Sequence, residues 1–325
     1  MPSEPSPTSL LGSFVVTICI SFMLYGMVVA QSYFYMLNSA KRDTWRLKGV
    51  VLAVWLLEVL HTALIIHMVY VYLVEDFTDL AGVGVIIWSV GLFVMVEMVI
   101  VGFVQGFYLR RIFFLSGRSY LITGIMGFLL FIRIALGLAT AALTYPLGQW
   151  AQFRQSTGPL VTLTMSLGLA ALVDVLIAGI LIFQLHRSKT GFRDTDSVIR
   201  SLMTYTVHTG AITGVVSLAI VISFVCLEDN LLFAGLATIT TKLYSNSFLG
   251  TLNTRELLRS KKRHVVEIPT VLSDPSTLQP QRGNAVTASQ LEASAFSGMT
   301  EVQVYKETHE FRDSASDNIE AKVTL

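Results

Sequence analysis

Hydrophobic residues between Leu10 and Leu252 are gathered into long runs that short polar stretches separate. A bilayer core about 30 Å thick requires roughly 20 apolar residues per helix. Seven runs are long enough to meet this requirement: Leu10–Met36, Gly49–Val74, Leu80–Tyr108, Ser119–Tyr145, Pro159–Leu185, Ser201–Leu227 and Leu231–Leu252. The pattern predicts an all-α fold, a polytopic membrane protein built as a bundle of seven transmembrane helices. No run has an internal proline, so we expect helices without sharp kinks.

The composition excludes an ordinary soluble domain. The chain is 53% hydrophobic and 14% charged, whereas soluble domains carry about 25% charged residues. So few charges cannot coat a soluble globule of this size with polar surface. A soluble enzyme and an intrinsically disordered chain are therefore both disfavoured. The net charge of +1 gives no reason to expect nucleic-acid binding.

The distribution of Lys and Arg among the polar stretches predicts the orientation. Sixteen of them fall in the first, third and fifth loops and just after the last run, while Arg154 is the single one in the opposite loops. Cytoplasmic loops carry an excess of basic residues, so we expect an external N-terminus and a cytoplasmic C-terminus. The predicted domains are a short extracellular segment (1–9), the seven-helix domain (10–254) and a disordered cytoplasmic tail (255–325). The expected location is the plasma membrane, with another endomembrane left open.

Basic residues cluster where the chain leaves the last run. They are Arg259, Lys261, Lys262 and Arg263. Such a cluster next to a membrane attracts anionic lipid. The usual positive-inside signal explains the cluster more simply and is favoured, and contact with anionic lipid stays open.

Ionisable residues inside the runs are the candidate functional residues. We predict an intramembrane polar layer formed by Glu58, His61, Glu97, Arg133, Asp174, His208 and Lys242. Charges at bilayer depth are costly and normally face a partner inside the bundle. Counting along the helices pairs Lys242 with Glu58 and Arg133 with Glu97 or Asp174. The layer is either a polar ligand site or proton path, or a structural network that fixes helix register.

Two residues of this layer invite comparison with known cofactor sites. Glu58-x-x-His61 has the spacing used in di-iron bundles, which require a second such motif and two more carboxylates; we expect no metal. Lys242 occupies the mid-seventh-helix position of the retinal lysine in microbial rhodopsins, but Thr238 stands where those proteins have an acid. We therefore expect a charge partner, with no cofactor and no catalytic residues.

The seven-span outline also resembles a G-protein-coupled receptor. The specific signatures of that class are missing, since the third run ends in Tyr108-Leu109-Arg110-Arg111 where an Asp-Arg-Tyr would be expected. Architecture alone carries no function.

A closer resemblance rests on the second half of the chain. The stretches that carry it are Thr195 to Ile199, His208-Thr209-Gly210, Lys242-Leu243-Tyr244-Ser245-Asn246-Ser247 and Leu252-Asn253-Thr254-Arg255, with Trp55-x-x-Glu58-x-x-His61 earlier. In these the chain resembles a fungal, mostly basidiomycete, seven-span family defined by a domain of unknown function (number 6534). The family motif falls on Lys242, Tyr244, Asn246, Asn253 and Arg255. The resemblance implies the fold and a membrane location, and no particular activity.

Within lipid, Asn246 is expected to bond a neighbouring helix. Asn253 and Arg255 are expected to contact the last helix carbonyls and the lipid headgroups.

Three classes of function remain on the sequence alone. A sensor or receptor fits the external N-terminus, the basic cytoplasmic loops and the long tail. A small-molecule or proton transporter fits the polar layer, although no internal repeat or proline-broken helix pair accompanies it. A membrane enzyme ranks last because no nucleophile–base pair or metal set is visible.

Overall fold

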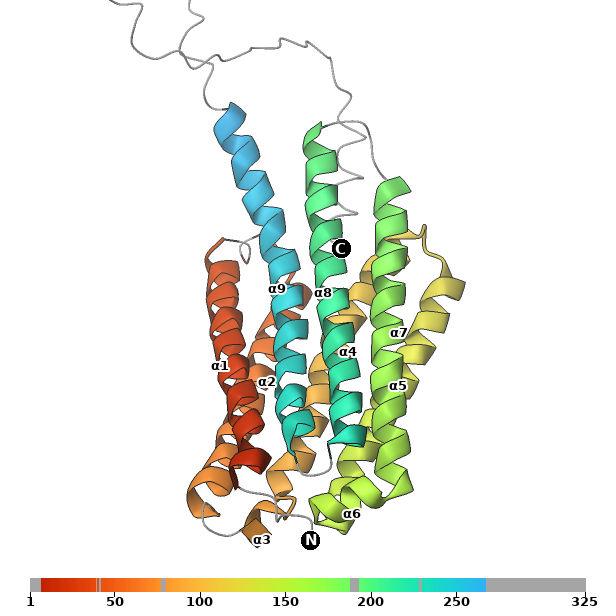
Figure 1. The fold of residues 1–325 in the computed structure, drawn as a ribbon. Coiled ribbons are helices and arrows are strands. Elements are labelled where there is room, and N and C mark those ends of the chain that lie inside the picture. The colour runs from red at the N-terminus through yellow and green to blue at the C-terminus, as the bar shows by residue number, and fades with distance from the viewer. Residues whose placement is uncertain are drawn as a thin grey trace, which may run out of the picture. The chain divides into compact units, whose positions relative to one another are not determined.

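The fold is known from a computed structural model, which describes residues 7–38, 40, 42–76, 80–187, 193–227 and 230–266. Helices make up the described chain: α1 (Pro7–Asn38), α2 (Trp45–Tyr70), the π-helical turn η1 (Val71–Glu75), α3 (Leu80–Val83), α4 (Trp88–Leu115), α5 (Tyr120–Leu147), α6 (Trp150–Gln155), α7 (Thr157–Arg187), α8 (Arg193–Cys226) and α9 (Leu232–Val266). The long helices lie side by side as a bundle (Figure 1).

Five of these helices are long and apolar enough to cross a membrane, namely Gly12–Asn38, Trp45–Glu75, Trp88–Leu115, Tyr120–Leu147 and Thr157–Gln184. Their outward faces carry large apolar side chains, for example Met23 at 74% exposure and Phe128 at 63%. Exposed apolar surface on that scale is what a lipid-facing helix presents. The chain is therefore a multi-pass, all-helical membrane protein.

The predicted third run begins eight residues too early. Leu80–Val83 forms the separate short helix α3, and α4 starts only at Trp88. The backbone between them is extended and pairs with the segment after α5, because Ile86 N donates to Gly148 O (2.8 Å) and Trp150 N donates to Gly84 O (3.0 Å). Hydropathy could not separate these residues from the helix, since this pairing buries Ile86 and Val83 as fully as a helix would.

Proline placement also differs slightly from expectation. Pro146 lies inside the last turn of α5, where we expected it to follow the helix. Gly148 then ends the helix in a left-handed conformation with φ of 60°, which glycine adopts without a Cβ penalty. A proline so close to the end disturbs few backbone hydrogen bonds, so the expectation of unkinked helices is not affected.

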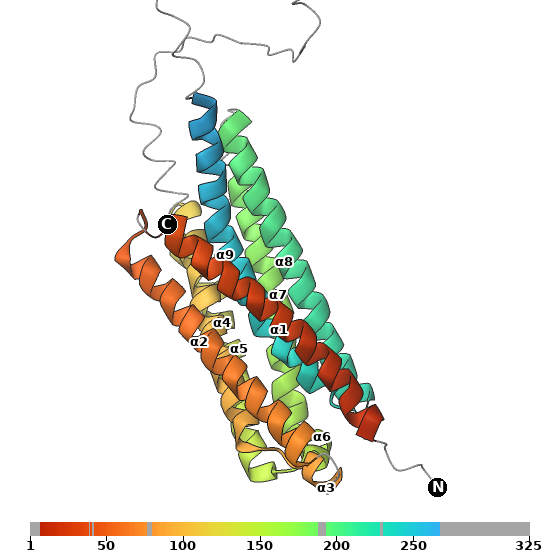
Figure 2. The same ribbon diagram turned by 90° about the vertical axis from the view of Figure 1, so that its left-hand side faces the viewer.

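Helix α9 differs from the five apolar helices. Nearly every side chain from Phe233 to Asn253 is buried, although this stretch is rich in Thr, Ser and Asn. The backbone of α9 approaches α1 so closely that a Cβ on Gly235 would lie 1.9 Å from Thr17 Oγ1. Figures 1 and 2 show α9 running alongside α1. A helix shielded from lipid in this way can be polar, provided that neighbouring helices satisfy its side chains.

The end of α9 goes beyond the predicted seventh run, from Leu252 to Val266. Residues 1–6 of the predicted external segment, and residues 267–325 of the predicted tail, lie outside the described residues.

Candidate functional site

The first polar network surrounds the ammonium group of Lys242 on α9. Its Nζ lies 2.5 Å from Glu58 Oε2, donates to Thr62 Oγ1 at 2.9 Å and lies 3.1 Å from His61 Nδ1. Lys242, Glu58 and His61 are all fully buried. The predicted pairing of Lys242 with Glu58 is confirmed. His61 belongs to the same network through its contact with Lys242.

The second oxygen of Glu58 is occupied as well. Ser245, three residues after Lys242 on α9, donates its hydroxyl to Glu58 Oε1 at 2.6 Å. Residues three apart share a helix face, so one face of α9 supplies both the cation and the hydroxyl. The ring of Tyr25 lies 5.3 Å from Lys242 Nζ, within the range of a cation–π contact. Both oxygens of Glu58 and the ammonium group of Lys242 therefore have partners within the bundle.

The second network is centred on Asp174 of α7. Its Oδ1 accepts from Gln105 Nε2 at 2.9 Å, and its Oδ2 accepts from Thr213 Oγ1 at 2.7 Å and Tyr244 Oη at 2.6 Å. The three donors come from α4, α8 and α9, so a single carboxylate joins four helices. Sequence reasoning missed Gln105 and Thr213; the signal that could have found Gln105 is an amide in the middle of an apolar run.

The predicted ion pair of Arg133 with Glu97 or Asp174 is wrong. Among the described residues, neither acid lies within 4.0 Å of the Arg133 guanidinium. The guanidinium carbon instead lies 5.1 Å from the centre of the Tyr244 ring. The physical reason is that neutral donors already surround Asp174, while the tyrosine offers the cation an aromatic face. The Nε and Nη1 of Arg133 have no hydrogen-bond partner in the described part of the chain.

The asparagines of the family motif bond to α1. Asn246 Nδ2 donates to Leu24 O at 3.0 Å and to Lys242 O at 2.8 Å, which confirms the predicted contact with a neighbouring helix. Asn253 Nδ2 donates to Gln31 O at 2.9 Å; the expected contact with the helix terminus is therefore wrong, because α9 continues past this residue. The side chains of Arg255 and His208 lie outside the described residues.

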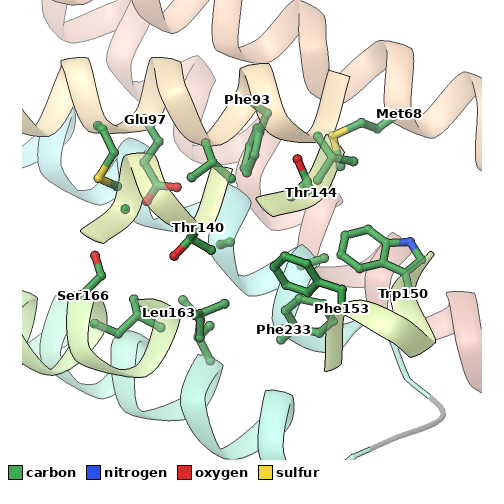
Figure 3. A pocket seen from close by; sticks show the side chains of 18 residues that line it. Met68, Phe93, Glu97, Thr140, Thr144, Trp150, Phe153, Leu163, Ser166 and Phe233 are labelled. Carbon is green, nitrogen blue, oxygen red and sulfur yellow. The ribbon is translucent and has the colours of Figure 1, made fainter. Parts of the chain in front are cut away.

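Glu97 belongs to neither network and faces a cavity. The cavity has a volume of about 90 Å³ and lies between α4, α5, α7 and α9, with α6 at one end. Figure 3 shows the Glu97 carboxylate turned into this space, near the hydroxyls of Thr140 and Ser166. The aromatic rings of Phe153 and Phe233 lie toward the other end. The cavity thus has one polar and one aromatic end.

The hydroxyl protons around Glu97 are already used. Ser166 Oγ donates to Arg133 O at 3.2 Å, and Thr140 Oγ1 lies within bonding distance of both Leu136 O (3.0 Å) and Thr162 Oγ1 (2.9 Å). Within the described residues the Glu97 carboxylate receives no hydrogen bond and no ion pair, although its side chain is only 7% exposed. A buried acceptor without a donor is destabilising. Because the carboxylate faces the cavity, a molecule bound there could supply the missing donor.

Comparison with known proteins gives one match. Residues 170–257 match the model of a Family of unknown function (DUF6534). No curated protein and no solved structure matches the chain.

The matched segment contains residues of both networks. Asp174 and Thr213 lie in it together with Lys242, Tyr244 and Asn246. Glu97 and the α4–α5 side of the cavity lie before it. The family model therefore covers much of α9 and its α7 and α8 partners, and leaves 14 of the 18 residues that line the cavity outside.

Proposed function

We propose that the chain is a seven-span sensor or receptor-like membrane protein that binds a small molecule in the Glu97 cavity. In this proposal α8 and α9 complete the set of spans. Support for α8 comes from its apolar stretch Gly210–Cys226. Support for α9 comes from its burial, since a helix surrounded by other helices does not need an apolar exterior.

The proposed topology has an external N-terminus and a cytoplasmic C-terminus, with segments 1–9, 10–254 and 255–325 as the external end, the membrane domain and the tail. Its support is the asymmetry of Lys and Arg. With this topology, α6 and the aromatic end of the cavity lie toward the outside. We further propose a fungal origin, a plasma-membrane location, no enzymatic activity, and contact of the Arg259–Arg263 cluster with anionic lipid.

One observation carries the proposed function: a buried acid that has no hydrogen bond or ion pair among the described residues faces a largely apolar cavity. Ligand sites are typically concave, apolar and provided with a few placed polar groups. A charge that served only to fix helix register would face a partner, as Glu58 and Lys242 do.

Thermal unfolding of the purified protein with a panel of small amphipathic molecules tests this function. At least one molecule should raise the unfolding temperature of the wild type, since a ligand that binds the folded state stabilises it. Ala237 lines the cavity, so Ala237→Phe should fill it and remove that shift. A shift that survives Ala237→Phe would mean that binding occurs elsewhere.

Labelling of single cysteines at Ser3 and Arg263, in a chain whose Cys19 and Cys226 are replaced, tests the topology. We expect external reagent to label position 3 and not position 263 in intact cells. Labelling of both positions from one side would contradict an odd number of spans.

A transporter is the second candidate, and a specific observation favours it. Two buried polar networks meet α9, one at Lys242 and one at Tyr244, and buried ionisable groups of this kind occur in proton pathways. Protein in liposomes should then carry protons down a pH gradient, and Asp174→Asn should stop the flux. A sensor would bind its ligand without any flux.

A further inference from the structure

We propose that the cavity takes a short aliphatic molecule whose one polar end is a hydrogen-bond donor, an alcohol or a protonated amine, and that this donor bonds the Glu97 carboxylate. The inference rests on the proposed function and specifies its ligand. Both alternatives share the same chemistry, which is an apolar body with a terminal O–H or N–H.

The choice of a donor follows from what surrounds Glu97. Its neighbours Thr140 and Ser166 direct their protons to backbone carbonyls and to Thr162. They leave the carboxylate with lone pairs and no proton source among the described residues. A ligand that only accepts hydrogen bonds would leave the carboxylate unsatisfied, whereas a donor supplies what is missing.

The apolar body follows from the rest of the wall. Away from Glu97 the cavity is lined by side chains such as Phe93, Leu163, Phe153 and Phe233. Apolar cavities stay empty of water and bind small hydrocarbons. The aromatic end, set apart from the carboxylate in Figure 3, therefore receives the hydrocarbon while the donor lies at the other end.

The volume limits the size of the ligand. A cavity of about 150 Å³ accepts benzene, and this one has about 90 Å³. A molecule with fewer non-hydrogen atoms than benzene, about five or fewer, is therefore the expected size. Gly137 and Met98 both line the cavity. A Cβ on Gly137 would lie 2.2 Å from Met98 Sδ, so Met98 packs against α5 where a larger residue at 137 would stand.

Three probes of equal size separate the possibilities: 1-butanol, butylamine, and methyl propyl ether, which lacks a donor. Affinities are measured on the purified protein by ligand-observed NMR. We expect the wild type to bind 1-butanol or butylamine on the order of tenfold more tightly than the ether. A preference for the amine identifies a cationic ligand, and a preference for the alcohol identifies a neutral one.

Glu97→Met is the decisive variant because it keeps the volume of the side chain and removes the acceptor. The donor probes should lose about tenfold in affinity while the ether keeps its own. For each probe, the ratio of its affinities for the wild type and the variant does not depend on how much of the probe enters the detergent. The unfolding temperature of Glu97→Met should be equal to or above that of the wild type, which distinguishes lost binding from lost structure.

Cavity filling separates the inference from the function on which it rests. Ala237→Phe, and independently Leu163→Phe, should abolish binding of all three probes while Glu97 remains. If filling removes binding but Glu97→Met leaves the ratio of butanol affinity to ether affinity unchanged, the donor inference is overturned and the cavity remains a binding site. If both filled variants bind the probes as the wild type does, the proposed site itself is overturned.

Discussion

Glu58 and Glu97 are both carboxylates inside the same helical bundle, at 0% and 7% exposure, and their surroundings differ. Lys242 and Ser245 occupy both oxygens of Glu58. The carboxylate of Glu97 receives no hydrogen bond among the described residues and faces a cavity. Burial alone therefore does not distinguish a structural charge from a binding charge. What distinguishes them is whether each oxygen of the carboxylate has a partner within the bundle.

The difference originates in the helices that face each acid. Helix α9 presents Lys242 and Ser245 to Glu58 on a single face, because residues three apart are neighbours on a helix. Opposite Glu97, α5 presents Gly137 and Thr140, again three residues apart. One facing helix supplies an ammonium group and a hydroxyl that reach the carboxylate. The other supplies a glycine and a threonine whose hydroxyl bonds elsewhere. A closed ion pair results in the first case and an open cavity in the second.

Removing the cation from the closed pair should have the largest effect on stability. Lys242→Met leaves Glu58 buried with Ser245 as its remaining donor. The loss of one partner of a buried pair costs about 3–5 kcal/mol in soluble proteins, and membrane contacts are often worth less. We expect a lower free energy of unfolding, measured by denaturation in mixed micelles.

The control is the double variant Lys242→Met with Glu58→Gln, which removes both charges. It should recover part of the loss, because no lone charge then remains. Additive losses in the two single variants and the double one would show that the 2.5 Å contact contributes nothing. A visible absorption band on adding retinal, abolished by Lys242→Met, would instead make Lys242 a chromophore anchor.

An intermediate effect is expected at Asp174, which resembles Glu58 in having both oxygens occupied but has no ion-pair partner among the described residues. Asp174→Ala removes the acceptor of Gln105, Thr213 and Tyr244. Leaving buried donors unsatisfied costs about 1–3 kcal/mol. The loss of unfolding free energy should be smaller than in Lys242→Met. Asp174→Asn keeps one acceptor, so its loss should be smaller still. Equal losses in Ala and Asn would argue against this network.

Replacing Glu97 should raise the free energy of unfolding, whereas replacing Glu58 or Asp174 should lower it. This variant therefore tests the difference between the acids most directly. Glu97→Met removes a buried acceptor that has no donor, so the free energy of unfolding should rise, by about 1 kcal/mol. Such gains at a binding residue are the usual exchange between stability and function. The matched control is Glu58→Met, which should lower the free energy of unfolding. A destabilised Glu97→Met would mean that the acid has a structural partner after all.

The sequence predicted the ion pair but not the cavity. Counting residues along two helices was sufficient to place Lys242 opposite Glu58, since each residue stands at a fixed height on its helix. The same counting misplaced Arg133, because height alone does not say that the Tyr244 ring meets its guanidinium. The short helix α3 was missed because the residues that follow it are as apolar in sequence as a membrane span. They are buried by pairing with the segment after α5.

The cavity could not be predicted because it depends on absent atoms. It forms where small residues of different helices, among them Gly137, Ala234 and Ala237, face one space. Each of them has an ordinary role in a membrane helix, where small residues let backbones approach. Which of them leave a space and which are filled by a neighbour is decided by tertiary packing, and no periodicity in the sequence reports it.

The smallest effect is expected from Tyr244→Phe, which changes one atom of the Asp174 network. The variant removes the hydroxyl that donates to Asp174 Oδ2 at 2.6 Å and keeps the ring beneath Arg133. Hydrogen bonds between membrane helices contribute about 0.6 kcal/mol on average, so the unfolding free energy should fall by about that amount.

A double-mutant cycle of Tyr244→Phe with Asp174→Asn measures the contact itself and should give a coupling of similar size. Tyr244→Ala is the matched control: it also removes the aromatic face from the guanidinium and should cost clearly more, because Arg133 Nε and Nη1 already lack partners in the described part of the chain. If Phe and Ala were equally destabilising, the hydroxyl alone would hold this network, and the Arg133 guanidinium would gain nothing from the tyrosine ring.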